Sequence, residues 1–147
     1  MKQIHSINSI TIPFPAEEIW MILTDITSYS LWWPSNVKIK VLNITEDFIG
    51  SQVEVRPYGG IPFFCEFSEC VTNAKLVMQY SGIYSGLGVW TLTETNGQTK
   101  LDYEINLEIN NLFIHLLSYV VPVDTIHHNL MNEVLLGLEN RLKNFVK

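Results

Sequence analysis

The sequence predicts an α+β fold: one strand, two short helices, a meander of about six further strands, and a long C-terminal helix. Three observations predict it. Apolar and polar residues alternate between Val37 and Ile109, as in half-buried strands. Apolar residues recur every three or four positions after Val123, as on one face of a helix. Two closely spaced prolines, Pro13 and Pro15, separate a first strand from the first helix.

The first third of the chain contains the two short helices. Residues 4–12 are rich in Ile, Ser and Thr and predict a strand. Pro15 suits the first position of a helix over 16–24, and Glu17 and Glu18 favour its positive end. A second short helical turn is expected over 27–33, and Pro34 closes it before the chain becomes extended.

The middle of the chain alternates in successive runs that turn signals separate. Runs begin near Val37, Val53, Phe63, Leu76 and Gly88. Asn96-Gly97 is typical of a two-residue hairpin turn and leads into the most regular run, Leu101 to Ile109. The polar residues of that run share one face, so one side of the sheet is expected to meet water.

The C-terminal third is predicted to be helical. Ile126, Leu130, Val134 and Leu138 mark the inner stripe of one long amphipathic helix. The preceding segment, residues 110–122, also has apolar residues at helical spacing. It fits either a mobile lid or, as favoured here, a short helix packed permanently against the sheet opening.

Composition and charge narrow the class of protein. The 147 residues are 47% hydrophobic and 16% charged, which predicts a single folded domain over 1–147. A net charge of −6 opposes binding to phosphate, so no nucleic-acid partner is expected. The most apolar stretch, residues 112–123, is too short to span a bilayer, and no signal peptide is evident. We expect a cytoplasmic protein, either a monomer or a weak homodimer.

The segment ITIPFPAEEIWMILTDITSYSLWWP, residues 10–34, resembles the opening signature of the SRPBCC, or START-like, superfamily. The matching features are a strand ending at proline, the pair Ile19-Trp20, Asp25, and the pair Trp33-Pro34. The hairpin around Asn96-Gly97 and the terminal helix are similar to the polyketide cyclase/dehydrase and lipid transport branch. The resemblance implies a helix-grip fold, in which the curved sheet wraps around the C-terminal helix and leaves a cavity between them.

The inward alternation then gives the expected lining of that cavity. It is apolar with few polar groups, as small-molecule pockets usually are. The resemblance favours a ligand cavity, whereas the residue types alone fit a solid core equally well. The expected ligand-binding residues are Phe63, Phe67, Met78, Tyr80, Trp90, Tyr103, Leu107, His127, Leu130, Met131 and Val134.

No catalytic or metal-binding constellation is evident, and no cofactor or metal is expected. His127 and His128 are adjacent on a helix and therefore do not share a face; only His127 falls on the inner side. A buried histidine satisfied within the protein is favoured over a ligand contact. Unbroken alternation would turn Glu69 inward as a candidate acid or base, but a bulge that lets it reach water is favoured. Cys65 and Cys70 are expected to be free thiols on opposite faces.

Three functions remain open. The first is non-catalytic binding or carriage of a small hydrophobic molecule, such as a lipid, isoprenoid or polyketide. The second is a cyclase or dehydratase in which Tyr80, Tyr103 and His127 orient the substrate and move protons. The third is a chaperone-cofactor-like interaction module, which the charged outer face of the sheet disfavours.

Overall fold

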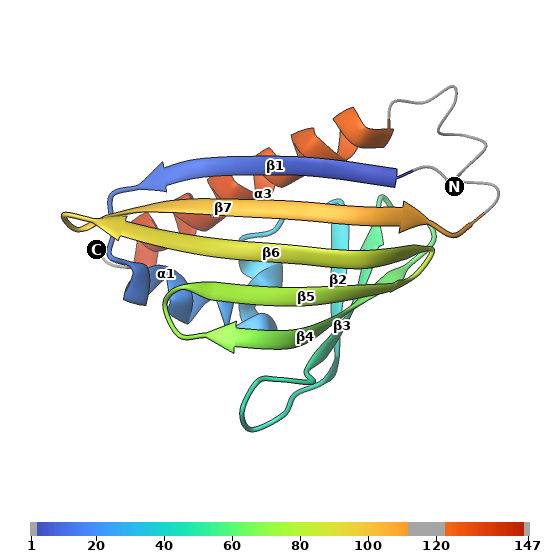
Figure 1. Ribbon diagram of the computed structural model, residues 1–147, viewed down its shortest axis with the longest axis horizontal. Helices are drawn as coiled ribbons and strands as arrows, with labels where there is room; N and C mark the ends of the chain where they lie inside the picture. The colour runs from blue at the N-terminus through green and yellow to red at the C-terminus, as the bar shows by residue number, and fades with distance from the viewer. Residues whose placement is uncertain (1–2, 112–122, 146–147) are drawn as a thin grey trace.

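A computed structural model describes residues 3–111 and 123–145. It shows one seven-stranded antiparallel sheet in the order β1-β7-β6-β5-β4-β3-β2, with a long helix against its concave face (Figure 1). The elements are β1 (Gln3–Ile12), α1 (Ala16–Leu23), the 3-10 helix η1 (Ile26–Leu31), β2 (Val37–Asn43), β3 (Gln52–Pro57), β4 (Phe63–Val71), β5 (Lys75–Gly82), β6 (Tyr84–Thr95), β7 (Gln98–Ile109) and α3 (Val123–Phe145). The predicted α+β helix-grip architecture is confirmed.

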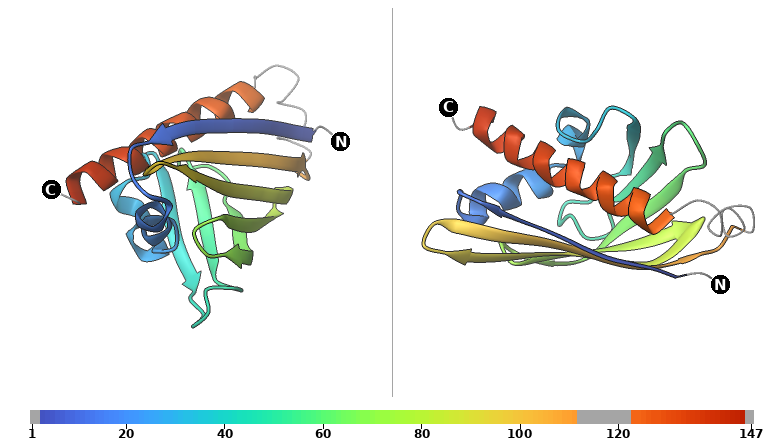
Figure 2. Two further views of the ribbon diagram at one scale, coloured as in Figure 1. Left: turned by 60° about the vertical axis from the view of Figure 1, so that its left-hand side comes forward. Right: turned by 90° about the horizontal axis from the view of Figure 1, so that it is seen from above.

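The two short helices lie at one end of the sheet, as Figure 2 shows. Pro15 is the residue that precedes α1 and has an extended backbone, so it is the N-cap and not the first helical residue as predicted. The first helical N–H, that of Ala16, donates to Oε1 of Glu94 at 2.7 Å. The second helix begins at Ile26, one residue earlier than expected, and its last turn leads into Trp32.

The sheet follows the predicted alternation closely in its centre. Every second residue of β7 from Leu101 to Ile109 is buried. The hairpin at Asn96-Gly97 is confirmed, because Thr95 of β6 pairs with Gln98 of β7. The sheet then curves, so that β2, β3 and β4 rise on the side where α3 lies (Figure 2).

A β-bulge in β4 changes the faces of the residues that follow it. Phe67 pairs with Met78 but Glu69 pairs with Val77, so Ser68 is an extra residue. Glu69 therefore points to solvent, with Oε1 3.5 Å from Nζ of Lys75, as the favoured interpretation required.

The same bulge brings both cysteines to the inner face. Cys70 pairs with the buried Leu76 and packs against the core. The expectation that Cys65 and Cys70 lie on opposite faces was wrong, because it assumed a strand without an extra residue. Both thiols are free, as predicted.

The long helix α3 packs against β1 and α1. Its buried stripe consists of Met131, Val134, Leu135, Leu138 and Leu142. Ile126, which was predicted to begin this stripe, is 41% exposed. No helix among the described residues is long and apolar enough to cross a membrane. The predicted lid or short helix falls on residues 112–122, which lie outside the described part of the chain.

Gly137 permits the close approach of α3 to the end of η1. A Cβ atom at this position would lie 2.0 Å from the carbonyl oxygen of Trp32, far inside van der Waals contact. A backbone oxygen cannot rotate away as a side chain can. The helix therefore needs glycine here, even though glycine is a poor helix former.

We predict that Gly137→Ala lowers the free energy of unfolding by about 1–3 kcal/mol, because the overlap outweighs the better helix propensity of alanine. Urea denaturation measures this change. Asn140→Ala, an exposed position on the same helix, is the control and should change stability by less than about 0.5 kcal/mol. An unchanged or raised midpoint for Gly137→Ala would show that α3 does not cross Trp32 this closely.

Candidate functional site

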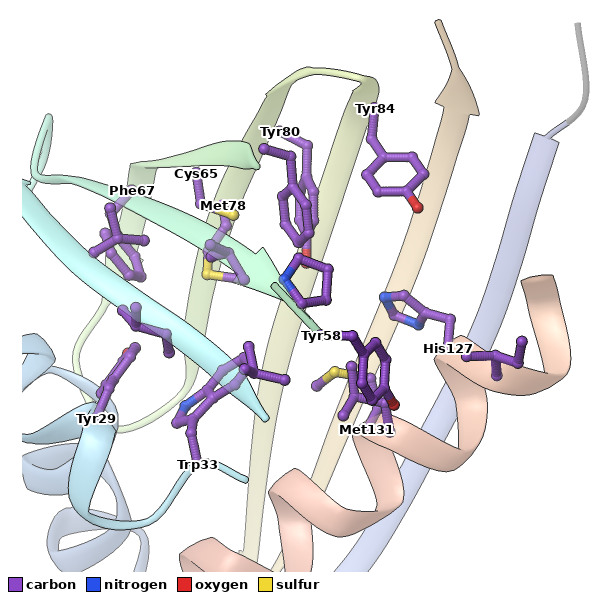
Figure 3. A pocket seen from close by; sticks show the side chains of 18 residues that line it. Tyr29, Trp33, Tyr58, Cys65, Phe67, Met78, Tyr80, Tyr84, His127 and Met131 are labelled. Carbon is purple, nitrogen blue, oxygen red and sulfur yellow. The ribbon is translucent and has the colours of Figure 1, made fainter. Parts of the chain in front are cut away.

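A cavity of about 220 Å³ lies between the β2–β5 half of the sheet and the N-terminal half of α3 (Figure 3). The strands contribute their inward-facing residues, and η1 with the turn after it closes one end. The lining residues are Tyr29, Trp33, Val37, Ile39, Val53, Val55, Pro57, Tyr58, Phe63, Cys65, Phe67, Met78, Tyr80, Tyr84, Ile126, His127, Leu130 and Met131.

The mouth of the cavity lies between the β3–β4 turn and the first turns of α3. Tyr58 in that turn is 57% exposed, and Ile126 on α3 is also exposed, although both line the cavity. By contrast Phe67 and Cys65, deeper in the sheet, are almost completely buried. The cavity therefore extends from the exposed Tyr58 and Ile126 inward along β4 and β5.

The structure brings together only part of the predicted lining. Phe63, Phe67, Met78, Tyr80, His127, Leu130 and Met131 line the cavity. Trp90, Tyr103, Leu107 and Val134 do not line it, because they are buried in the close-packed core. Since α3 lies along β1, the helix covers the sheet directly over β7 and β6, and the cavity lies where β2–β5 curve up beside the helix.

Several lining residues were not found from the sequence. The alternation of Val37, Ile39, Val53 and Val55 was recognised, but nothing in it shows that β2 and β3 fold over the cavity. In the sequence, Trp33 stands out only as part of the Trp33-Pro34 pair that resembles the family signature. Its position in the wall depends on where η1 ends, which no sequence period reveals.

A pair of tyrosines separates the cavity from the close-packed core. The hydroxyls of Tyr80 on β5 and Tyr103 on β7 hydrogen-bond to each other across β6. Gly88 of β6 leaves the room for this, since a Cβ there would lie 2.5 Å from Oη of Tyr103. On the core side, the ring of Tyr103 packs on Trp90 with centroids 4.3 Å apart.

Burial keeps both tyrosines protonated. Desolvation raises the pKa of Tyr80 and of Tyr103 well above the ordinary value of 10. Burial likewise raises the pKa of the Cys65 thiol, which lies opposite Tyr80 on the neighbouring strand. The pair and the thiol are therefore neutral at physiological pH, and each tyrosine hydroxyl already has a partner.

His127 is the polar side chain that α3 presents to the cavity, as Figure 3 shows. Its Nδ1 is buried and has no hydrogen-bond partner among the described residues. Burial, with a smaller contribution from His128, lowers its pKa from 6.5 to about 4, so the ring is neutral at pH 7. The favoured expectation of a histidine satisfied within the protein was thus wrong for this nitrogen.

His128 points away from the cavity, as the helical geometry predicted. Its Nδ1 lies 3.1 Å from Oγ of Ser6 on β1. Nearby, Nδ2 of Asn8 donates to the carbonyl oxygen of His128 at 2.9 Å and to Oδ1 of Asn132 at 2.8 Å. His128 and its neighbours therefore fasten α3 to the edge strand.

The described lining includes no Asp, Glu, Lys or Arg. Arg56 lies on the outer face, where Nη1 donates to the carbonyl oxygen of Gly60 at 2.9 Å. Within residues 3–111 and 123–145, no three His, Cys, Asp or Glu side chains come close enough to hold a metal ion. His115 belongs to the segment that is not described.

The fold is of the START-like type, with a cavity between the sheet and α3. The family model described as "Polyketide cyclase / dehydrase and lipid transport" matches residues 12–132. The chain therefore belongs to this family, as the resemblance in its first 34 residues indicated. A comparison with curated protein sequences found no match.

Solved structures show the same fold at low sequence identity. A START superfamily protein from Mycobacterium smegmatis superposes with a TM-score of 0.76 and 15% identity, over 96% of this chain and 98% of that one. The Zhui aromatase/cyclase from Streptomyces sp. R1128 gives 0.74 and 15%, over 99% and 97%. The Aha1 dimer from Colwellia psychrerythraea gives 0.64 and 20%, over 97% and 96%. These similarities establish the fold of this chain. They do not assign it the activities of the similar proteins.

The lowered pKa of His127 predicts a loss of stability in acid. Between about pH 6.5 and pH 4 the unfolded chain takes up a proton at this position and the folded chain does not, so the folded state becomes less stable as pH falls. At about 1.4 kcal/mol per pKa unit, the fall from 6.5 to about 4 corresponds to a loss of up to about 3.5 kcal/mol over this whole pH range.

Urea unfolding of the wild type and of His127→Phe at about pH 7.5 and about pH 4.5 isolates this contribution. We expect His127→Phe to remove that part of the acid destabilisation, and His128→Phe, the matched control, to retain it. Equal pH dependence in the wild type and His127→Phe would contradict the buried, neutral state of this ring.

Proposed function

We propose that this protein binds one small, largely apolar molecule in the cavity and acts as its carrier or sensor. The observation that supports this is the cavity itself: about 220 Å³ of space with aromatic, aliphatic and sulfur-containing walls and no charged side chain in its described lining. An engineered apolar cavity of about 150 Å³ stays dry and takes up benzene. A molecule of one or two rings, or a short branched chain, would therefore fit here.

The walls favour flat apolar ligands. The ring of Phe63 stacks on Tyr80 with centroids 5.4 Å apart and meets Tyr84 edge-on at 5.2 Å. These rings offer both faces and edges to an aromatic guest. Met78 and Met131, on opposite walls, have flexible thioethers that can adapt to its outline.

The enzyme hypothesis receives less support from these residues. It assigned proton transfer to Tyr80, Tyr103 and His127, but Tyr103 does not line the cavity and its hydroxyl is bonded to that of Tyr80. The neutral His127 is a weak base, because its pKa is about 4. Sharing a fold with an aromatase/cyclase is therefore a reason to expect a similar cavity, but it is not evidence that a reaction takes place there.

Leu130→Trp tests the proposal by filling the cavity. Leu130 lines the cavity and is only partly buried, so we expect an indole there to occupy ligand space with a change in melting temperature of less than about 2 °C. Binding of naphthalene, followed by its fluorescence and by calorimetry, should weaken by about tenfold or more.

Leu138→Trp is the matched control on the same helix. Leu138 is completely buried in the close-packed core and does not line the cavity. The same enlargement should cost about 1–3 kcal/mol of stability there through overpacking. The proposal is contradicted if the wild type binds neither naphthalene nor any member of a panel of apolar molecules, or if Leu130→Trp is as destabilised as Leu138→Trp with ligand binding unchanged.

A further inference from the structure

The cavity contains a buried polar atom that the protein leaves without a partner. Nδ1 of His127 is shielded from water, and no described residue hydrogen-bonds to it. A buried polar group in this condition destabilises a protein unless something else satisfies it. Figure 3 shows the ring extending from α3 toward the strands of the cavity wall, where a bound molecule would lie.

We propose that the cavity selects molecules whose polar group is an uncharged hydroxyl, which hydrogen-bonds to Nδ1 of His127, and that it rejects carboxylates of the same size. This inference rests on the proposed function and gives it a ligand class. A hydroxyl suits either tautomer of a neutral imidazole, because it can both donate and accept a hydrogen bond.

The absence of charge in the described lining is the reason for rejecting an anion. Among the described residues, no Lys or Arg side chain lines the cavity, and Lys38 and Lys40 of β2 are exposed on the outer face. A carboxylate in the cavity would lose its water without gaining a cation, and that loss is large.

His127 does not supply the missing cation. Its pKa of about 4 shows that the site already disfavours a charged imidazolium. To hold a carboxylate the protein would have to protonate His127 as well, and two charges would then be removed from water together. An uncharged hydroxyl requires neither change.

Trp33 also has a buried donor that a ligand oxygen could satisfy, a state that it shares with Trp32 and Trp90, which do not line the cavity. The indole of Trp33 lines the cavity, and its Nε1 is buried without a partner within the described chain. An indole N–H only donates, so it favours a ligand oxygen and offers nothing to an ammonium group. A phenol-like or alcohol-like oxygen is compatible with both His127 and Trp33.

Three probes that share a naphthalene ring separate the effects of apolar contact, a hydroxyl and a negative charge. Naphthalene is apolar, 2-naphthol adds a neutral hydroxyl, and 2-naphthoate is an anion at neutral pH. Calorimetry with the wild type should show 2-naphthol binding roughly 3- to 10-fold more tightly than naphthalene, the advantage of one buried hydrogen bond. It should show 2-naphthoate binding at least about tenfold more weakly than 2-naphthol.

His127→Phe keeps an aromatic ring at the site but removes the hydrogen bond. In this variant we expect the affinity for 2-naphthol to fall to that for naphthalene, while naphthalene still binds. His128→Phe, the matched control on the outer side of the helix, should keep the full preference for 2-naphthol.

The outcomes distinguish the two proposals. If none of the three probes binds, the proposed function fails and this inference fails with it. If naphthalene binds but 2-naphthoate binds as well as 2-naphthol, only the inference is overturned. It is also overturned if His127→Phe weakens naphthalene and 2-naphthol equally, because the effect would then be one of shape and not of a hydrogen bond.

Discussion

One long helix has to cover the apolar face of a seven-stranded sheet, and a single helix is too narrow to contact every strand. The position of the helix therefore determines where the interior is close-packed and where it contains a cavity. The helix α3 lies along the edge strand β1, held there by the hydrogen bonds of Asn8 to the His128 carbonyl and to Asn132. Its buried leucines therefore fill the space over β7 and β6. The remaining strands curve toward the helix without reaching it, and the space that they enclose is lined by rings, methyl groups and thioethers.

The cavity has polar groups on two of its sides, and these groups differ in whether their hydrogen bonds are satisfied within the protein. The hydroxyls of Tyr80 and Tyr103 hydrogen-bond to each other over Gly88. Each buried hydroxyl in the wall between core and cavity therefore has a partner. On the opposite side of the cavity, Nδ1 of His127 is buried and has no such partner among the described residues. In an apolar cavity, a single unsatisfied polar atom orients a guest more strongly than the many interchangeable apolar contacts around it.

The sequence predicted the architecture well because local periodicity reports which face of an element is buried. The alternation of residues 101–109 and the Asn96-Gly97 turn needed no knowledge of other strands. The bulge at Ser68 could not be located in this way, since it exists only in the register of β4 against β5. It turned Glu69 to solvent, as the favoured interpretation required, but reversed the expected face of Cys70. Trp90 and Tyr103 were assigned to the correct face of the sheet. Whether an inward residue contacts the helix or lines the cavity depends on the path of α3, and the alternation within one strand contains no information on that path.

The positions of the methionines allow the most direct test of the central claim, that an apolar molecule binds between the sheet and α3. Met78 on β5 and Met131 on α3 line opposite walls, whereas Met21 on α1 is 60% exposed beside a separate surface groove. In protein labelled with ¹³C at the methionine methyl groups, intermolecular NOEs from bound 2-naphthol should appear at both Met78 and Met131 and be absent at Met21. NOEs to Met21 alone, or no NOE to either cavity methionine under saturating ligand, would contradict the account.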